Sequence, residues 1–234
     1  MKTIGLIGGM SWESSIEYYR MINQFVREEL GGLHSAKSVL VSLDFAEIEA
    51  LQAAGHWEKA GELMLEAARQ VEGGGGDFVV ICTNTMHLLA EQVQAGIGIP
   101  VLHIADATEH EIQRKGLHQV GLLGTRFTME KDFYRGRLED EHGLAVLIPV
   151  EEDRKTVHEV IYQELVLGEI RERSRERYLE IIQRLADRGA EGIILGCTEI
   201  GLLVKQEDVQ LPVFDTAQIH AWIAVQAALG TYPL

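Results

Sequence analysis

Two pairs of apolar segments repeat along the chain at nearly one spacing, and this repeat limits the folds that the chain can adopt. Each segment is a run of buried-strand character that ends at glycine or small polar residues. The pairs are residues 78–85 with 192–199 and residues 4–8 with 120–124. Corresponding positions are 114 to 116 residues apart. The spacing predicts a duplicated half-domain, in which Thr83 and Cys197 face each other across the join.

Composition and charge exclude several classes of function. The 234-residue chain has a formal net charge of −15, whereas binding to nucleic-acid phosphates or an anionic membrane needs clustered Lys and Arg. The sequence has no run of roughly 18 apolar residues, the length that is needed to span a bilayer. The N-terminus enters a strand by Thr3 without the apolar stretch of a secretory signal. Only Cys82 and Cys197 are present, so we expect no disulfide framework and a cytoplasmic protein with reduced thiols.

Apolar runs alternate with amphipathic segments of helical spacing, which predicts βαβ units and mostly parallel sheets. The expected strands are 3–8, 38–44, 78–82, 100–104, 119–124, 145–149, 191–196 and 212–215, and the expected helices are 13–30, 57–72, 105–116, 129–142, 154–166, 170–188 and 216–229. The prediction is an α/β fold of two domains, each a mostly parallel four-stranded sheet flanked by helices. The first domain takes 1–104 plus 210–234, because the segment after Pro212 is expected to return to it, and the second takes 105–209.

Motifs for cofactor and metal binding are missing from the sequence. It has no G-x-G-x-x-G dinucleotide fingerprint, no phosphate loop and no G-x-S-x-G elbow. Cys82 and His87 are the only local pair of suitable zinc ligands, too few for a site. His87 is interpreted as a packed, hydrogen-bonded histidine, and Cys82 as core, since strand alternation turns it away from Thr83. We therefore expect no cofactor and no metal.

The end of the strand over 191–196 places a thiol where chemistry can occur. Gly196 lets the backbone turn sharply before Cys197, and Thr198 and Glu199 suit the start of a helix. A thiol at a helix N-terminus ionises more easily than a free cysteine, and a thiolate can serve as nucleophile or base. The alternative is a buried, inert cysteine, which is common for a lone free thiol.

The matching strand end places a hydroxyl, an amide and a second hydroxyl in succession, at Thr83, Asn84 and Thr85. Asn and Thr are preferred N-caps, so Asn84 or Thr85 is expected to cap a helix over 86–95. The same backbone N–H groups and side chains are suited to hold a carboxylate at that helix N-terminus. The two interpretations are compatible.

Short segments along nearly the whole chain resemble the aspartate/glutamate racemase family. Residues 83–87 (Thr-Asn-Thr-Met-His) are similar to the family's Cys-Asn-Thr-x-His segment, and 196–199 to its Gly-Cys-Thr-Glu segment. Residues 7–14 resemble the opening of the amino-acid racemase branch. Further similar stretches are 42–45, 123–128 and 161–165.

The resemblance implies two pseudo-symmetric α/β domains with an active site in the cleft between them. It also implies racemisation without pyridoxal phosphate by two opposed cysteines, one taking the α-proton as a thiolate while the other returns a proton to the opposite face. Cys197 matches the second of these cysteines and is assigned as the base. Thr83 stands where the family has the first, so it takes a weaker role as proton donor or relay.

The resemblance also suggests which residues bind the substrate. These are Asn84, Thr85, Thr198, Met10, Ser11, Gln52, Thr125 and Thr128. Met10 could equally be core and Gln52 solvated, and Thr125 or Thr128 could cap the helix beginning near 128. A dicarboxylic amino acid would need a cation at its side chain, and Arg126, the nearest one, can equally face water. The expected partners are a small amino acid (aspartate, glutamate or another polar one) and a second copy in a homodimer.

Because one cysteine of the pair is missing, two alternatives stay open. Single-cysteine relatives of the superfamily, such as malonate-type decarboxylases and cis–trans isomerases, stabilise a similar carbanion-like or enolate-like species. A binding protein that keeps the carboxylate site without chemistry is the second alternative.

Overall fold

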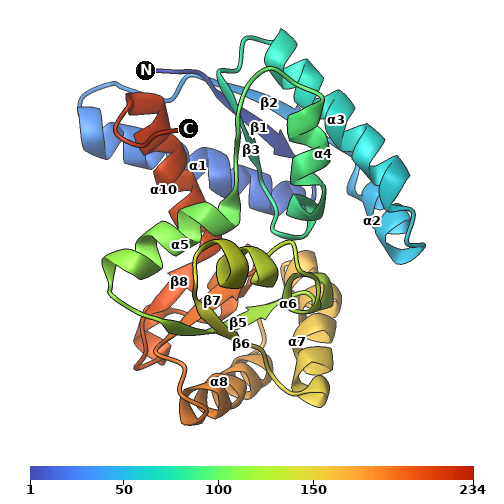
Figure 1. The fold of residues 1–234 in the computed structure, drawn as a ribbon, viewed down its shortest axis with the longest axis vertical. Coiled ribbons are helices and arrows are strands. Elements are labelled where there is room, and N and C mark those ends of the chain that lie inside the picture. Colours follow the sequence, from blue (N-terminus) through green and yellow to red (C-terminus); the bar gives the residue numbers. More distant parts are fainter. The chain divides into compact units, whose positions relative to one another are not determined.

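Each half of the chain forms a four-stranded parallel sheet, and the two sheets have the same strand order (Figure 1). The first sheet has the order β2-β1-β3-β4 and the second β6-β5-β7-β8. The strands are β1 (Ile4–Gly8), β2 (Ser38–Ser42), β3 (Phe78–Ile81), β4 (Val101–Leu102), β5 (Gln119–Gly124), β6 (Ala145–Leu147), β7 (Gly192–Gly196) and β8 (Val213–Asp215). This computed structural model describes residues 1–234, and it confirms the predicted α/β class with two parallel sheets.

Helices cover both faces of the first sheet, as right-handed crossovers between parallel strands require. They are α1 (Trp12–Leu30), α2 (Phe45–Ala53), α3 (Trp57–Gly73), the 3-10 helix η1 (Thr85–Leu89), α4 (Ala90–Ala95) and the part of α10 (Thr216–Leu229) from His220 onward. Helix α5 (Ile104–Arg114) belongs to the second unit except for its first residue. The chain moves from β1 to β2 through α1 and back to β3 through α2 and α3, so α1 and α3 lie on opposite faces (Figure 1).

Close packing of α3 on the first sheet depends on a glycine in β1. A Cβ atom at Gly5 would lie 2.0 Å from Val71 Cγ1 of α3 and 2.7 Å from the Phe78 carbonyl oxygen of β3. The Val71 side chain therefore occupies the space that a larger residue would need, and it is fully buried. The helix packs directly on β1, β2 and β3 as a result.

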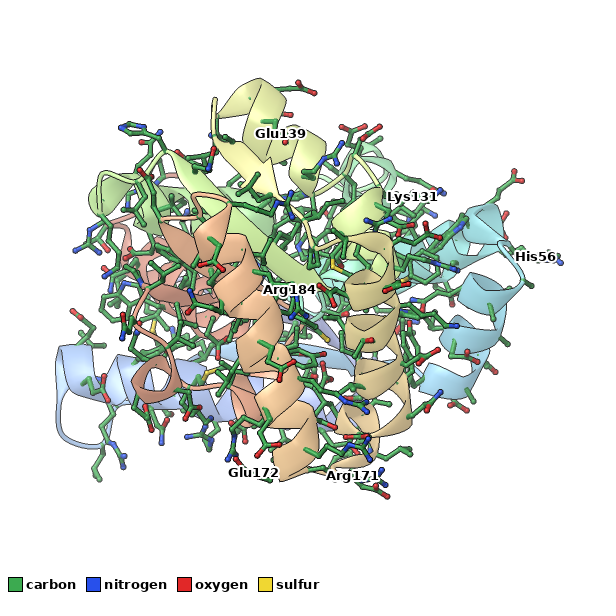
Figure 2. The ribbon with its side chains drawn as sticks, turned by 90° about the horizontal axis from the view of Figure 1, so that it is seen from below. His56, Lys131, Glu139, Arg171, Glu172 and Arg184 are labelled. Carbon is green, nitrogen blue, oxygen red and sulfur yellow. The ribbon has the colours of Figure 1, made fainter.

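Helices also cover the second sheet, and they differ in part from the sequence prediction. They are α6 (Arg126–Glu130), η2 (Arg137–Glu141), α7 (Glu151–Gln163), η3 (Leu165–Leu167), α8 (Glu172–Asp187), α9 (Ile200–Leu203) and η4 (Gln206–Asp208). Of these, α9 and η4 were not among the expected helices. The single helix expected over 129–142 is divided, because the extended backbone of Lys131 ends α6. On the outer side, Arg184 of α8 (Figure 2) binds Asp153 of α7 through Nε and a terminal nitrogen, at 2.9 and 2.8 Å.

The chain divides into one unit of residues 1–104 and 220–234 and another of residues 105–219. Residues 210–219, which the sequence analysis assigns to the first domain, thus group with the second unit. The reason is strand pairing: β8 forms its ladder with β7, with Leu195 opposite Asp215. Only the part of α10 from His220 onward packs in the first unit. No helix combines the length and the apolar character needed to cross a bilayer.

The strand order gives each sheet one topological switch point, between β1 and β3 in the first and between β5 and β7 in the second. From β1 the chain moves to β2 on one side and then returns to β3 on the other, and β5, β6 and β7 repeat this course. In open parallel sheets, ligands bind beyond the carboxyl ends of the strands at such a switch point. The residues that follow β1 and β3, and those that follow β5 and β7, are therefore the candidates for function.

A buried histidine joins three elements of the first unit. His220 of α10 donates from Nε2 to the Leu102 carbonyl oxygen of β4 at 3.0 Å, and its Nδ1 accepts from the Tyr18 hydroxyl of α1 at 3.0 Å. Burial, with a smaller effect from His87, lowers the pKa of His220 to about 3. The imidazole therefore stays neutral throughout the physiological pH range.

Acid is expected to destabilise the protein through His220. An exposed histidine in the unfolded chain binds a proton below about pH 6.5, whereas the folded state does not until about pH 3. Stability is therefore lost as the pH falls below the unfolded pKa, by about 2 kcal/mol between pH 7 and pH 5 through this group. Urea denaturation at the two pH values measures the loss of unfolding free energy.

The matched comparison is between two histidine variants. His220→Gln is expected to lose about 2 kcal/mol less than the wild type over the same pH interval. His56→Gln changes an exposed histidine (Figure 2) and should keep the wild-type loss. Equal losses in all three proteins would contradict the assignment of acid sensitivity to His220.

Candidate active site

The end of β3 presents Thr83 at the edge of the first sheet. Cys82 is 1% exposed and its amide donates to the Ile7 carbonyl oxygen of β1 at 2.9 Å, whereas Thr83 is half-buried. Burial raises the pKa of the Cys82 thiol far above its usual value. The interpretation of Cys82 as core is confirmed, and Thr83 is the more exposed of the two residues at this strand end.

The residues after Thr83 start a helix differently from the prediction. A 3-10 turn begins at Thr85, and Asn84 precedes it with helical backbone angles and without a side-chain cap hydrogen bond. Asn84 and Thr85 are both buried, at 3% and 6% exposure. The expected N-cap at Asn84 or Thr85 is therefore not formed by Asn84. Their predicted contact with substrate stays a prediction.

The end of β1 carries a compact set of hydroxyl groups. Ser11 is the N-cap of α1, and its Oγ accepts from the Ser14 amide at 3.3 Å. Ser15 Oγ donates to the Ser11 carbonyl oxygen at 2.9 Å and accepts from the Gly9 amide at 2.7 Å. These bonds hold the loop after β1 against the first turn of α1, so Ser11 has a fixed place beside the switch point of the first sheet.

Met10 and Gln52 are both buried. Met10 belongs to the hydrophobic cluster of the first unit, together with Ile7, Ile48 and Met86. Gln52 of α2 is 6% exposed and donates from Nε2 to Met86 Sδ at 2.9 Å. The alternative that Met10 is core is confirmed, and the alternative that Gln52 is solvated is wrong. A role in binding substrate stays a prediction for both.

The end of β7 presents Cys197, which is paired with a carboxylate. The thiol of Cys197 donates to Glu199 Oε2 at 2.9 Å, and the Thr198 hydroxyl donates to the same oxygen at 2.6 Å. Cys197 is 8% exposed and Glu199 is 5% exposed. One carboxylate oxygen therefore holds both the thiol and the neighbouring hydroxyl at the edge of the second sheet.

The structure reverses the expectation that Cys197 ionises easily. Burial and the adjacent Glu199 carboxylate raise the pKa of the Cys197 thiol well above its usual value. The helix that follows is short, since α9 spans only Ile200–Leu203, and its partial positive charge does not outweigh these two effects. Cys197 is therefore a neutral thiol in the resting protein.

Replacing Glu199 with glutamine is expected to make Cys197 easier to ionise. Glutamine keeps the size of the side chain but removes the negative charge that opposes the thiolate, so the pKa of Cys197 falls. Alkylation by iodoacetamide should become several-fold faster at pH 8, and the ultraviolet absorbance of the thiolate should appear at lower pH. Cys82→Ser in both proteins leaves one thiol to observe. An unchanged titration would show that the carboxylate does not control the thiol.

The end of β5 repeats the arrangement found after β1. Thr125 is the N-cap of α6, and its Oγ1 accepts from the Thr128 amide at 3.3 Å and lies 3.2 Å from Thr128 Oγ1. Thr128 is fully buried, and a Cβ at Gly124 or Gly196 would meet its side chain at 3.1 Å. Thr125 thus corresponds to Ser11, and the predicted cap is formed by Thr125 for a helix that begins at Arg126.

No cation of the second unit is identified as a ligand for a substrate side chain. Arg126 is exposed, and its backbone amide donates to His158 Nδ1 at 3.3 Å. Another cluster joins Asp106, Glu141 and His142, whose ligand atoms lie within 4.8 Å of one another. Arg137 already bonds both carboxylates of this cluster, with bonds to Asp106 at 2.6 and 3.0 Å and to Glu141 at 3.3 Å. We assign that cluster to ion pairing.

Two residues of these strand ends have partners that sequence reasoning did not identify. Glu199 lies two positions after Cys197, and this proximity is the signal that could have indicated a thiol partner. His87, interpreted as packed and hydrogen-bonded but without a named partner, bonds with Nδ1 to the Thr83 carbonyl oxygen at 2.8 Å. That contact depends on the 3-10 geometry of η1, which the sequence did not predict.

Comparisons with known proteins agree with this arrangement. The model of the Asp/Glu/Hydantoin racemase family matches residues 7–224. A candidate Asp/Glu racemase from Yersinia pestis is 55% identical, with a TM-score of 0.92 over 98% of this chain and 100% of that one. An aspartate racemase homologue from Pyrococcus horikoshii OT3 is 35% identical, with a TM-score of 0.86 over the same shares.

A curated relative extends the likeness to an amino-acid racemase. The broad specificity amino-acid racemase RacX of Bacillus subtilis (strain 168) is 23% identical over 174 residues, which are 71% of each chain. The match of the family model covers both sheets and all four strand ends described above. The chain belongs to the Asp/Glu/Hydantoin racemase family.

Proposed function

We propose that this protein is an amino-acid racemase that works without pyridoxal phosphate, acting on aspartate, glutamate or another polar amino acid. Cys197 takes the α-proton, and Thr83 is the weaker partner at the opposite face of the planar intermediate. The observation that carries the proposal is that β3 and β7, equivalent strands of two sheets of identical order, are followed within two residues by Thr83 and Cys197. Inversion needs one proton-handling group on each face of the α-carbon, and a duplicated fold supplies two.

The acid–base states of the two groups define how the reaction starts. Cys197 is a thiol at rest and must lose its proton before it can act as a base. Glu199 Oε2, 2.9 Å from the sulfur, is the group in contact with that proton. A substrate ammonium near this pair would offset the negative charge of Glu199 and favour the thiolate. The thiolate then removes the α-proton, and the negative charge moves into the substrate carboxylate.

Groups suited to receive that charge are found at all four strand ends. Ser11 and Thr125 are buried N-cap residues after β1 and β5, and Thr85 and Thr198 follow β3 and β7. Hydroxyl and backbone N–H donors fixed in place before the reaction stabilise a developing carboxylate dianion without reorganisation. We propose that these residues, with Asn84, bind the α-carboxylate and ammonium groups of the substrate.

The substrate class follows from the relatives and from the charges. An aspartate racemase homologue and a broad specificity amino-acid racemase are both similar to this chain. Arg126, the cation nearest the motifs, is exposed, and recognition of a side-chain carboxylate would need a fixed cation or several neutral donors. We therefore propose polar amino acids as the class, with aspartate and glutamate as the first to be tested.

The decisive experiment follows the α-proton and the optical rotation together. Each enantiomer of aspartate and glutamate is incubated separately with the protein in deuterium oxide. Racemisation is expected from both enantiomers with one kcat/KM, because enantiomers have equal free energy in water. Exchange of the α-proton is expected to be faster from the enantiomer that presents it to Cys197, because a threonine hydroxyl is a far weaker acid and base than a thiol.

The outcomes separate the parts of the proposal. Thr83→Ala should abolish inversion while Cys197 still exchanges the α-proton of one enantiomer. Equal exchange from both enantiomers in the wild type would count against Thr83 as the weaker partner. No exchange and no loss of rotation with any amino acid would overturn the racemase itself.

A further inference from the structure

His87 is held between the ends of two neighbouring strands. It lies in η1, the turn that follows Thr83, and is 2% exposed. One ring nitrogen, Nδ1, is 2.8 Å from the Thr83 carbonyl oxygen, and the other, Nε2, is 3.2 Å from the Ile104 amide nitrogen. The side chain thus connects the residue after β3 with the residue that begins α5, just beyond β4.

The two bonds assign the tautomer of His87. A carbonyl oxygen can only accept, so Nδ1 must carry a hydrogen and donate it to Thr83. The Ile104 amide can only donate, so Nε2 must keep its lone pair. His87 is therefore a neutral imidazole with its hydrogen on Nδ1. A second proton on Nε2 would point at the N–H group of Ile104.

The bond from His87 satisfies the Thr83 carbonyl oxygen, which has no partner strand opposite it in the sheet. The β3–β4 ladder consists of Val79 opposite Val101 and Val80 opposite Leu102, so it ends before Thr83. On the β1 side, the bond from the Cys82 amide to the Ile7 carbonyl oxygen lies one residue before Thr83. The Thr83 carbonyl group lies beyond both ladders, and the His87 imidazole is what bonds it.

Two further histidine rings support the His87 imidazole. The His103 ring lies 4.8 Å away and the His220 ring 5.6 Å away, measured between centroids. His220 is itself fixed by the Tyr18 hydroxyl and the Leu102 carbonyl oxygen, at 3.0 Å each. The ring that bonds Thr83 therefore packs against two other rings, and one of them, His220, is itself bonded to α1 and β4.

We infer that His87 is a positioning residue for Thr83, whose main chain it fixes so that the hydroxyl meets the α-carbon of the substrate at a constant place. The inference rests on the proposed role of Thr83 in proton transfer. Small displacements of a reacting group cost large factors in rate, about a hundredfold for 1 Å. The thiol side of the reaction, at Cys197, does not depend on this bond.

Two amide variants of His87 separate the effect of losing the hydrogen bond to Thr83 from the effect of losing the packing of the ring. In His87→Asn the side-chain nitrogen occupies the place of Nδ1 and can still donate to Thr83, but it does not reach Ile104. In His87→Gln the longer side chain reaches the place of Nε2, where its amide oxygen can accept from the Ile104 amide, and Thr83 is left unbonded. Both variants remove a ring from the histidine cluster, so their losses of packing are similar.

We expect His87→Gln and His87→Asn to differ in the proton transfer at Thr83 and to agree in the proton exchange at Cys197. His87→Gln should lower kcat for racemisation about ten- to a hundredfold with KM within about twofold, while α-proton exchange from the enantiomer facing Cys197 persists. His87→Asn should stay within about threefold of the wild type. Equal losses in both variants, or a loss of exchange and inversion together, would overturn the inference in favour of a packing role.

A measurement on the resting protein tests the inference even if the racemase proposal fails. The nitrogen-15 chemical shifts of His87, assigned by comparison with the Asn variant, report which ring nitrogen carries the hydrogen. We expect the Nδ1–H form without titration between pH 5 and pH 8. An Nε2–H form, or a ring that gains a proton in this interval, would overturn the inference independently of any activity.

Discussion

Replacing Cys197 with alanine is expected to abolish both racemisation and α-proton exchange, with a loss in kcat/KM of about 10³-fold or more. The alanine variant removes the one thiol at a strand edge but leaves the sheet unchanged, because Cys197 lies after β7 and not in its ladder. Polarimetry measures the loss of inversion, and proton NMR in deuterium oxide measures the loss of exchange.

Cys82 provides the matched control for this loss. It is the second cysteine of the chain, it is 1% exposed, and it lies in the core after β3. Cys82→Ala should keep activity within about twofold of the wild type and cost about 1 kcal/mol of stability. If the two alanine variants lost activity equally, the assignment of the base to Cys197 would fail.

Gly9→Ala is expected to cost at least about 3 kcal/mol of stability. Gly9 has a φ of 87° in the loop after β1. A Cβ there would lie 2.1 Å from the Leu43 carbonyl oxygen and 2.6 Å from the Leu43 amide nitrogen. These are backbone atoms held by the sheet, since the Leu43 amide donates to Gly8 at 3.0 Å, and they cannot move aside.

Gly168→Ala separates backbone conformation from steric clash. Gly168 has a φ of 75° in the left-handed region, but a Cβ there would meet no atom within 4 Å. It should therefore cost only about 1 kcal/mol, the penalty of the left-handed conformation. Denaturation midpoints compare the two variants, and equal losses would mean that the approach of Leu43 to Gly9 is not limiting.

The strand ends could be predicted from the sequence because they depend on local pattern. Apolar runs that stop at Thr83 and Cys197 are visible directly, and the cap at Thr125 follows from residue type. Helix α2 was missed because only Ile48 and Gln52 of its residues are buried, and one of these is polar, so it lacks a clear apolar face. The partner strand of β8 was also missed, because pairing with β7 is a long-range property.

The protonation state of Cys197 could not be predicted either, because it also depends on contacts that the local sequence pattern does not define. Sequence position suggested a helix N-terminus and an easily ionised thiol. The structure adds a Glu199 oxygen at 2.9 Å and nearly complete burial, and both act in the opposite direction. The direction in which the Glu199 side chain turns is set by packing, so it cannot be predicted from its spacing to Cys197 in the sequence.

The division of the chain also has a consequence for its synthesis. Residues 220–234 belong to the first unit, where the Ala228 carbonyl oxygen accepts from the Lys2 amide at 2.8 Å and His220 joins α1 to β4. A nascent polypeptide therefore makes β1 to β4 before α10 and completes the packing of that unit only once α10 has left the ribosome. A chain that stops short of residue 220 would leave the apolar surface beneath α10 uncovered.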